Sequence, residues 1–195
     1  QIAERGPRVF AIEPNEAMRN AGVRHPRIEW IAGNAESTTL PDESVDLVSC
    51  FQSFHWFDPS PAIDEFLRIL RSPHGRVAAI WNERDPSDPF TREYGELVRE
   101  ISDNHPAESR ETSADALYES ARLGEIRRLT FPHEQVLDLE GLVGRAESTS
   151  YLPSEGPRHS ELIRRLRQLF DRRSSEGRVR LRYVTSLYLG NIRGA

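Results

Sequence analysis

Residues 8–14 of this chain read RVFAIEP. This stretch is a short apolar run, rich in β-branched and aromatic residues, and it ends in an acid and a proline, Glu13 and Pro14. Such a run is typical of a strand buried in a parallel sheet. The following segment, NEAMRNAG, predicts a helix that begins after the N-cap Asn15 and ends at Gly22.

The same alternation of strand and helix continues as far as Trp81. Further strands are predicted near 28–32, 45–51 and 76–81, with an amphipathic helical segment at 64–71 before the last of them. Strands that alternate with helices indicate βα units joined into a parallel sheet. The fold class is therefore α/β, with a doubly wound and mostly parallel sheet.

The pattern changes in the second half of the chain. Helices are predicted near 91–103, 114–122, 137–148 and 161–173, and strands near 125–131 and 178–189. The final strand is expected to pair antiparallel at one side of the sheet, and the helices are expected to form a cap.

The composition excludes several kinds of chemistry. All 26 basic residues are Arg, so the chain offers no lysine for a Schiff base, for pyridoxal phosphate or for a Walker-type phosphate loop. Because Arg pairs bidentately with carboxylates, the composition does not exclude an acidic substrate. The net charge of -5 gives no positive field that would point to nucleic acid.

The cysteine and histidine content excludes further kinds of site. Cys50 is the only cysteine, which excludes an intrachain disulfide, and the six histidines are too scattered for a metal site. No apolar run approaches membrane-spanning length. We therefore expect a cytoplasmic protein without a metal.

Two short segments at strand ends are candidates for ligand binding. Glu13 follows a parallel strand, and in the ligand crevice of a doubly wound sheet such a carboxylate accepts hydrogen bonds from both ribose hydroxyls. The alternative is a solvated acid at a strand end. After the second strand, Gly33-Asn34-Ala35-Glu36 offers an amide side chain and a backbone N–H to an adenine ring, whereas the alternative is an ordinary turn.

The third candidate segment, residues 50–58, reads CFQSFHWFD and gathers four aromatic rings, counting His55, at a strand end. Loops after strand ends carry most sites of α/β proteins. Trp56 offers a face for a planar or cationic group, and His55 can accept a proton near neutral pH. The alternative is a core cluster under a helix, and it applies most strongly to Phe54 and Phe57.

Taken in order, three segments resemble the core of class I S-adenosylmethionine-dependent methyltransferases, which is Rossmann-like. They are RVFAIEPNEAM, AGNAESTTLPDESVDLVSCFQSFHWFD and FLRILRSPHGRVAAIW. They are similar in particular to the methyltransferase type 11 group, which includes trans-aconitate methyltransferase-like proteins. The resemblance covers residues 1–85 well and the remainder weakly, through residues 148–151 and 183–185.

The resemblance implies a cofactor and assigns site residues. S-adenosyl-L-methionine would be bound by Glu13 at the ribose, Met18, Asn34 and the Ala35 amide at the adenine, and Phe51 and Gln52 at the methionine part. Trp56 and Trp81 would face the acceptor, with His55 as the general base.

One element of the family is missing. The family holds the methionine part with a glycine-rich loop after its first strand, whereas residues 1–6, QIAERG, resemble the helix that follows that loop. The missing strand would lie in the middle of the sheet, so its neighbours would keep unpaired backbone groups, which is unfavourable. We therefore expect the sequence to be incomplete. Residues 1–85 would form the cofactor-binding core, and residues 86–195 a helical cap with the acceptor region and the closing strands.

These expectations favour methyl transfer to a small-molecule acceptor, either a carboxylic acid or another oxygen or nitrogen nucleophile. Residues 88–113, with the helix near 160–173, are expected to cover the acceptor as a lid. One alternative is a degenerate, non-catalytic Rossmann-like module used for association. Binding of nucleic acid or membrane through the Arg-rich C-terminal third is disfavoured, because acids are interspersed among the arginines.

Overall fold

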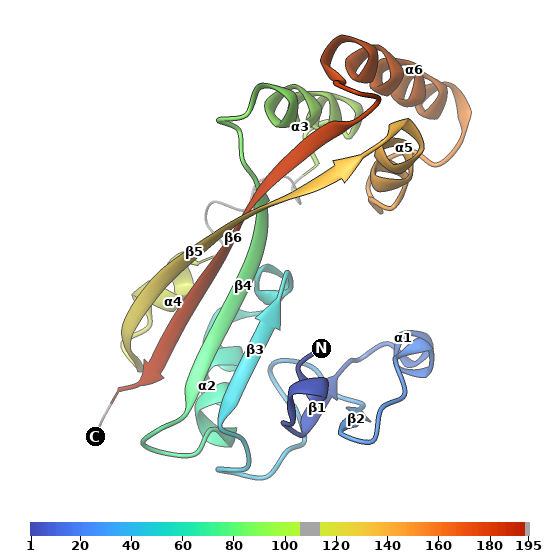
Figure 1. Ribbon diagram of the computed structural model, residues 1–195. Coiled ribbons are helices and arrows are strands. Elements are labelled where there is room, and N and C mark those ends of the chain that lie inside the picture. Colours follow the sequence, from blue (N-terminus) through green and yellow to red (C-terminus); the bar gives the residue numbers. More distant parts are fainter. Residues whose placement is uncertain (106–113, 194–195) are drawn as a thin grey trace. The chain divides into compact units, whose positions relative to one another are not determined.

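The computed structural model describes residues 1–105 and 114–193 (Figure 1). Its helices are α1 (Glu16–Ala21), α2 (Pro59–Ile69), α3 (Pro89–Ile101), α4 (Asp115–Glu119), α5 (Leu139–Glu147) and α6 (Gly156–Arg173). Its strands are β1 (Val9–Ile12), β2 (Ile28–Ile31), β3 (Leu47–Phe51), β4 (Arg76–Arg84), β5 (Leu123–Leu137) and β6 (Val179–Ile192). Short 3-10 turns cover Ala3–Arg5 and Phe54–Trp56.

The chain divides into two compact units. Unit 1 comprises Gln1–Ala79, Ala114–Arg127 and Tyr188–Ala195, and unit 2 comprises Ile80–Ser113 and Arg128–Leu187. The three strands β4, β5 and β6 contribute residues to both units. The predicted division of function near residue 85 stays a prediction.

The strands form two sheets. β1 and β2 pair in parallel, with Val9 opposite Ile28 and Ile12 opposite Ile31. The other sheet has the strand order β3-β4-β6-β5, in which β6 runs against both of its neighbours (Figure 1). The predicted α/β fold class with a closing antiparallel strand is confirmed.

Three strands of unit 1 have a single neighbour each. Among the described strands, β1 and β2 pair only with each other, and β3 pairs only with β4. The side chains of Leu47 and Phe51 on β3 are 50% and 56% exposed. The outer edges of these strands therefore leave backbone donors and acceptors without a ladder.

The predicted strands near 8–13, 28–32 and 45–51 agree with β1, β2 and β3, but β5 is much longer than expected. It spans Leu123–Leu137, whereas the sequence pattern indicates a strand only near 125–131. Side chains from Arg127 to Val136 are exposed, so no apolar alternation marks this part of the strand. Pro132 is tolerated because β5 is an edge strand of its sheet.

The core of unit 1 is built on α2. Its buried apolar residues recur at helical spacing, at Ala62, Ile63, Phe66 and Ile69. Residues 77–79 of β4 are buried as well. The end of α2 is joined to the segment before β3, because the Ile69 carbonyl accepts hydrogen bonds from the backbone of Ser44 and Val45.

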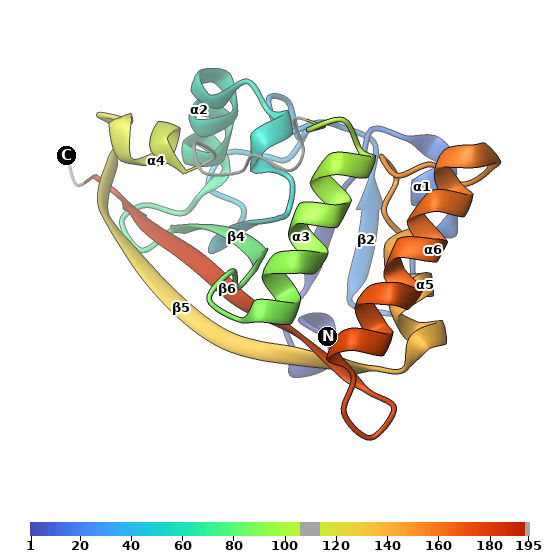
Figure 2. The ribbon, with the colours of Figure 1, turned by 90° about the horizontal axis from the view of Figure 1, so that it is seen from above.

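Unit 2 has its own core between three helices and the first part of β6. Both views place α3 beside α6 (Figures 1 and 2). The apolar residues of α6 recur at helical spacing and are largely buried, with Leu162, Leu166 and Leu169 at 1% exposure or less. They pack in one cluster with Leu142 of α5 and Val98 of α3.

Candidate functional site

The turn after β1 fixes the first candidate residue. The Oε1 atom of Glu13 accepts a hydrogen bond from the backbone N–H of Asn15, at 2.9 Å. Asn15 caps α1 as predicted, because its side chain accepts from the Met18 N–H at 3.1 Å. Arg19 donates to the backbone carbonyl of Glu13 at 2.8 Å. The carboxylate is therefore held at the strand end.

Two features of this turn suit a ligand. The Oε2 atom of Glu13 has no hydrogen-bond partner within the described residues, so one carboxylate oxygen remains available as an acceptor. The side chain of Met18 is 60% exposed, although Met is an apolar residue. An acceptor oxygen and an exposed apolar surface lie within one short segment.

The second candidate segment is a tight turn after β2. Asn34 and Ser37 exchange two backbone hydrogen bonds, of 3.2 and 3.3 Å, around Ala35 and Glu36. Gly33 allows a close approach there, because an added Cβ would lie 3.0 Å from the Ser37 carbonyl oxygen, which is a tight contact. The exposed side chain of Asn34 has no hydrogen-bond partner in the part of the chain that the structure describes. The turn thus presents a free amide.

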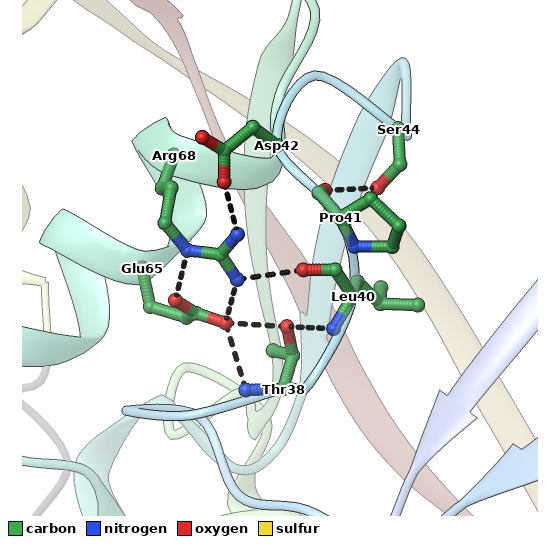
Figure 3. A network of polar contacts seen from close by, with 7 residues as sticks. All are labelled: Thr38, Leu40, Pro41, Asp42, Ser44, Glu65 and Arg68. Atoms are coloured by element: carbon green, nitrogen blue, oxygen red, sulfur yellow. Dashed lines mark hydrogen bonds and ion pairs between the residues drawn. The ribbon is translucent and has the colours of Figure 1, made fainter.

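A buried carboxylate fastens the loop after this turn to α2 (Figure 3). Glu65 is 8% exposed, and its Oε1 atom accepts from the N–H and the hydroxyl of Thr38, at 2.8 and 2.5 Å. Arg68 donates to both carboxylate oxygens, at 2.7 and 2.8 Å. The hydrogen bonds from Arg68 lower the pKa of Glu65 to about 2; burial opposes this shift, and the Thr38 donors reinforce it.

Arg68 extends this contact further along the loop. It donates to the Leu40 carbonyl at 2.8 Å and to Asp42 at 2.5 Å (Figure 3). These interactions join Thr38, Leu40 and Asp42 to α2, and we call the set of five residues the Glu65 network. It holds the chain that leads away from the Asn34 turn.

A second carboxylate fastens the Asn34 turn itself. The Oε1 atom of Glu36 accepts a hydrogen bond from the backbone N–H of Asp58, at 2.9 Å. Asp58 is the N-cap position of α2 and directly follows the aromatic segment. The turn with Asn34 and the segment with His55 are therefore connected.

The aromatic segment separates into a buried and an exposed part. Phe54 is 2% exposed and meets Phe57 edge-to-face at 5.9 Å, and Phe57 meets Phe66 of α2 at 6.4 Å. Phe54 is a core residue, and Phe57 is half-buried beside it. In contrast, Trp56 is 70% exposed, and its ring centroid lies 5.0 Å from that of the half-buried His55.

The residue between β3 and this segment has an unusual backbone. Gln52 has a φ of 54°, in the left-handed region that a residue with a Cβ rarely adopts. It follows Phe51, the exposed last residue of β3. Strained residues of this kind cluster at binding and catalytic sites, so the position suits a site at the end of β3.

The remaining predicted site residue belongs to the other unit. Trp81 belongs to unit 2, on β4, and is 3% exposed, whereas all other predicted site residues belong to unit 1. Its shared role with His55 stays a prediction. Residues 106–113 of the predicted lid lie outside the described residues.

Cysteine and metal chemistry are not supported by the described residues. Burial raises the pKa of the Cys50 thiol to about 12, so it is protonated at neutral pH. No group of three or more metal-ligating side chains occurs within residues 1–105 and 114–193. None of the described helices is long and apolar enough to cross a membrane.

The sequence analysis did not identify Glu65, Arg68 or Glu36 as part of the site. A signal for the first was present, because Glu65 lies between Ile63 and Phe66 on the apolar side of α2. An acid in that place requires a partner, and Arg68 follows at a spacing of three. The backbone partners in the loop have no sequence signature.

Comparison with known proteins identifies a family for this chain. A methyltransferase domain family model matches residues 1–79. An uncharacterized methyltransferase of Mycobacterium tuberculosis is 32% identical over 171 residues, which cover 87% of this chain and 67% of the relative. Two uncharacterized relatives in Schizosaccharomyces pombe, a methyltransferase and a methyltransferase-like protein, are 31% and 33% identical and cover 80% and 71% of this chain. The chain spans 66% and 56% of the lengths of these two.

Solved structures agree on the fold. A candidate type II methyltransferase of Anaeromyxobacter dehalogenans aligns over 100% of this chain and 84% of its own, with a TM-score of 0.72 and 23% identity. A candidate methyltransferase from an antibiotic biosynthesis pathway of Anabaena variabilis aligns over 95% of this chain and 83% of its own, with a TM-score of 0.66 and 21% identity. The chain therefore belongs to the class I S-adenosylmethionine-dependent methyltransferase family.

Proposed function

We propose that this chain transfers a methyl group from S-adenosyl-L-methionine to a small-molecule acceptor, a carboxylic acid or another oxygen or nitrogen nucleophile. The observation that carries the proposal is the carboxylate of Glu13 at the end of β1. One of its oxygens holds the turn, and the other has no partner within the described residues. A carboxylate in this place suits the ribose hydroxyls of a nucleoside.

The other predicted residues of unit 1 complement Glu13. Asn34 offers a free amide at a fixed turn, and the exposed Met18 offers an apolar surface for an adenine ring. Phe51 and Gln52, at the end of β3, would flank the methionine part. We assign these residues, with the Ala35 amide, to cofactor binding.

When bound, S-adenosyl-L-methionine supplies a methyl group activated by a sulfonium centre. The chain's task is to align the acceptor and to exclude water. His55 would take the proton of a hydroxyl or amine acceptor, whereas a carboxylate acceptor needs no base. Trp56 and Trp81 would cover the acceptor, since indole faces also stabilise a positive charge.

The non-catalytic alternative, an association module, is not favoured by the relatives, which are named methyltransferases. A cytoplasmic location is part of the proposal and rests on the composition.

The experiment combines cofactor binding with turnover. Calorimetry with S-adenosylhomocysteine should show a loss of about 1–3 kcal/mol of binding free energy for Glu13→Ala, because charge-assisted hydrogen bonds to the ribose are removed. Glu16→Ala, an exposed acid in the first turn of α1, is the matched control and should bind as the wild type does. Equal affinity of Glu13→Ala and wild type would remove Glu13 from the site.

The same proteins are then screened for methylated acids, phenols and amines by mass spectrometry. His55→Ala should slow methyl transfer to hydroxyl or amine acceptors while its affinity for S-adenosylhomocysteine stays unchanged. Unchanged turnover in His55→Ala with such an acceptor would make His55 a packing residue. Wild-type protein that neither binds S-adenosylhomocysteine nor methylates an acceptor would support the association alternative instead.

A further inference from the structure

Unit 2 contains a half-buried arginine whose partners are all neutral. Arg145 lies in the last turn of α5. Its Nε atom donates to the Tyr183 hydroxyl at 3.3 Å, and Nη1 donates to the hydroxyls of Ser148 and Thr149, at 3.1 and 3.5 Å. Nη2 has no hydrogen-bond partner within the described residues. The guanidinium therefore keeps unused donors in a partly desolvated place.

Several other arginines of unit 2 form ion pairs with carboxylates. On α6, Arg158 pairs with Asp103 at 2.5 Å and Arg165 pairs with Glu100 at 2.8 Å. In the described part of the chain no carboxylate lies within ion-pair distance of Arg145. A charge that leaves water is normally compensated by an opposite charge, and here that charge is missing.

Phenol rings surround this guanidinium. Tyr94, Tyr151 and Tyr183 lie close enough to interact electrostatically with Arg145. Tyr94 is 1% exposed, and no hydrogen bond joins its hydroxyl to another described residue. Burial raises the pKa of Tyr94 to about 12, so its hydroxyl is a neutral donor at neutral pH. The Tyr183 hydroxyl donates to Gln135 Oε1 at 3.3 Å, so the unused donors of the cluster are those of Arg145 and Tyr94. The cluster lacks a negative charge.

A purely structural role makes a different prediction. A cation in the last turn of a helix is stabilised by the helix dipole, and Arg145 occupies such a position. Arg99 occupies the same position in α3 of the same unit, but it is exposed and makes no ion pair with a described residue. The dipole explains both arginines equally, whereas it does not explain the hydroxyl groups gathered around Arg145.

We propose that Arg145, with the hydroxyl of Tyr94, forms a binding site for a carboxylate group of the acceptor. A guanidinium binds a carboxylate through two parallel N–H···O bonds, and the neutral phenol of Tyr94 adds a donor without repulsion. The assignment of this carboxylate to an acceptor rests on the proposed function. The binding of a carboxylate by unit 2 does not depend on it.

The test measures binding without turnover. The full chain is titrated by calorimetry with succinate, with its neutral dimethyl ester and with inorganic phosphate, and the melting temperature is followed in parallel. Wild type should bind succinate and not the ester. Arg145→Gln should bind succinate at least about tenfold more weakly, and Arg145→Lys should recover part of the affinity because it keeps the charge but not the planar fork. Arg99→Gln is the matched control and should bind as the wild type does.

Four outcomes would overturn the proposal. They are equal succinate affinity in Arg145→Gln and wild type, an equal loss in Arg99→Gln, binding of the ester by wild type, and no binding of succinate by wild type. Equal affinity for phosphate would overturn the assignment to a carboxylate. The melting temperatures of the unliganded variants show whether Arg145→Gln is folded. If it is not, the succinate affinity of Arg145→Lys is compared with that of wild type instead.

Affinity for S-adenosylhomocysteine, measured on the same proteins, should be the same in Arg145→Gln and in wild type. Failure of wild type to bind S-adenosylhomocysteine would contradict the proposed function. It would not contradict carboxylate binding by unit 2, which the succinate titration tests separately.

Discussion

Glu65 in unit 1 and Arg145 in unit 2 are both charged side chains on helices that face the interior, and their surroundings differ. Glu65 is surrounded by a guanidinium, a hydroxyl and a backbone N–H, so its charge is compensated within the chain. Arg145 is surrounded by neutral hydroxyls. A compensated charge stabilises the fold, whereas an uncompensated one has binding capacity left for a ligand. This difference separates a structural residue from a candidate site residue.

The largest expected effect is on stability, and it should fall on one of the two residues only. Glu65→Ala should lower the free energy of unfolding by about 2–3 kcal/mol, since several charge-assisted hydrogen bonds are lost. Arg145→Ala should cost about 1 kcal/mol or less, because its acceptors are uncharged hydroxyls and its hydrogen bonds are long. Urea denaturation measures both. Asp64→Ala, which breaks an exposed ion pair with Arg122 beside Glu65, is the control and should change little. Equal losses of unfolding free energy in Glu65→Ala and Arg145→Ala would contradict the distinction between a structural and a candidate site residue.

The second prediction uses acid to remove one charge. The pKa of Glu65 is lowered from 4.5 to about 2, so its contribution is complete above pH 4.5 and is lost as the pH falls towards 2. Roughly 60% of this contribution should be gone at pH 3. The measurement is the difference in unfolding free energy between wild type and Glu65→Gln at pH 6 and at pH 3. A difference that does not shrink with acid would show that Glu65 titrates at its ordinary pKa.

The smallest effect concerns the contact that ties the Asn34 turn to α2. Glu36→Ala removes the hydrogen bond to the Asp58 N–H and should cost about 0.5–1 kcal/mol of stability. Because the turn is less well held, affinity for S-adenosylhomocysteine should fall a few-fold. Calorimetry checks the affinity, with Glu16→Ala as the control. An unchanged affinity would show that Glu36 does not position the turn.

The strands that were predicted correctly are those whose burial shows in the sequence as a run of apolar residues. β1, β2 and β3 are short apolar runs between polar turns, so their places were predictable. β5 was predicted too short because its second half is exposed on an edge and carries no apolar pattern. The position of an edge strand is set by the neighbour it pairs with, which a local pattern does not contain.

The candidate site divides in the same way. Glu13 and Asn34 were predictable because a strand end followed by a polar residue is a local signal. The loop partner of Glu65 and the tyrosine partner of Arg145 were not, since each lies far away in the sequence: Thr38 for the first and Tyr183 for the second. Whether a charge is compensated is a property of the folded chain.

The lone cysteine has a practical consequence. Cys50 is the only thiol of the sequence, lies on β3 and is 6% exposed, and its pKa of about 12 leaves almost no thiolate at neutral pH. An alkylating reagent can therefore modify it only when β3 separates from its surroundings. The rate of alkylation therefore measures how often unit 1 opens locally. Mass spectrometry detects the modification without any added label.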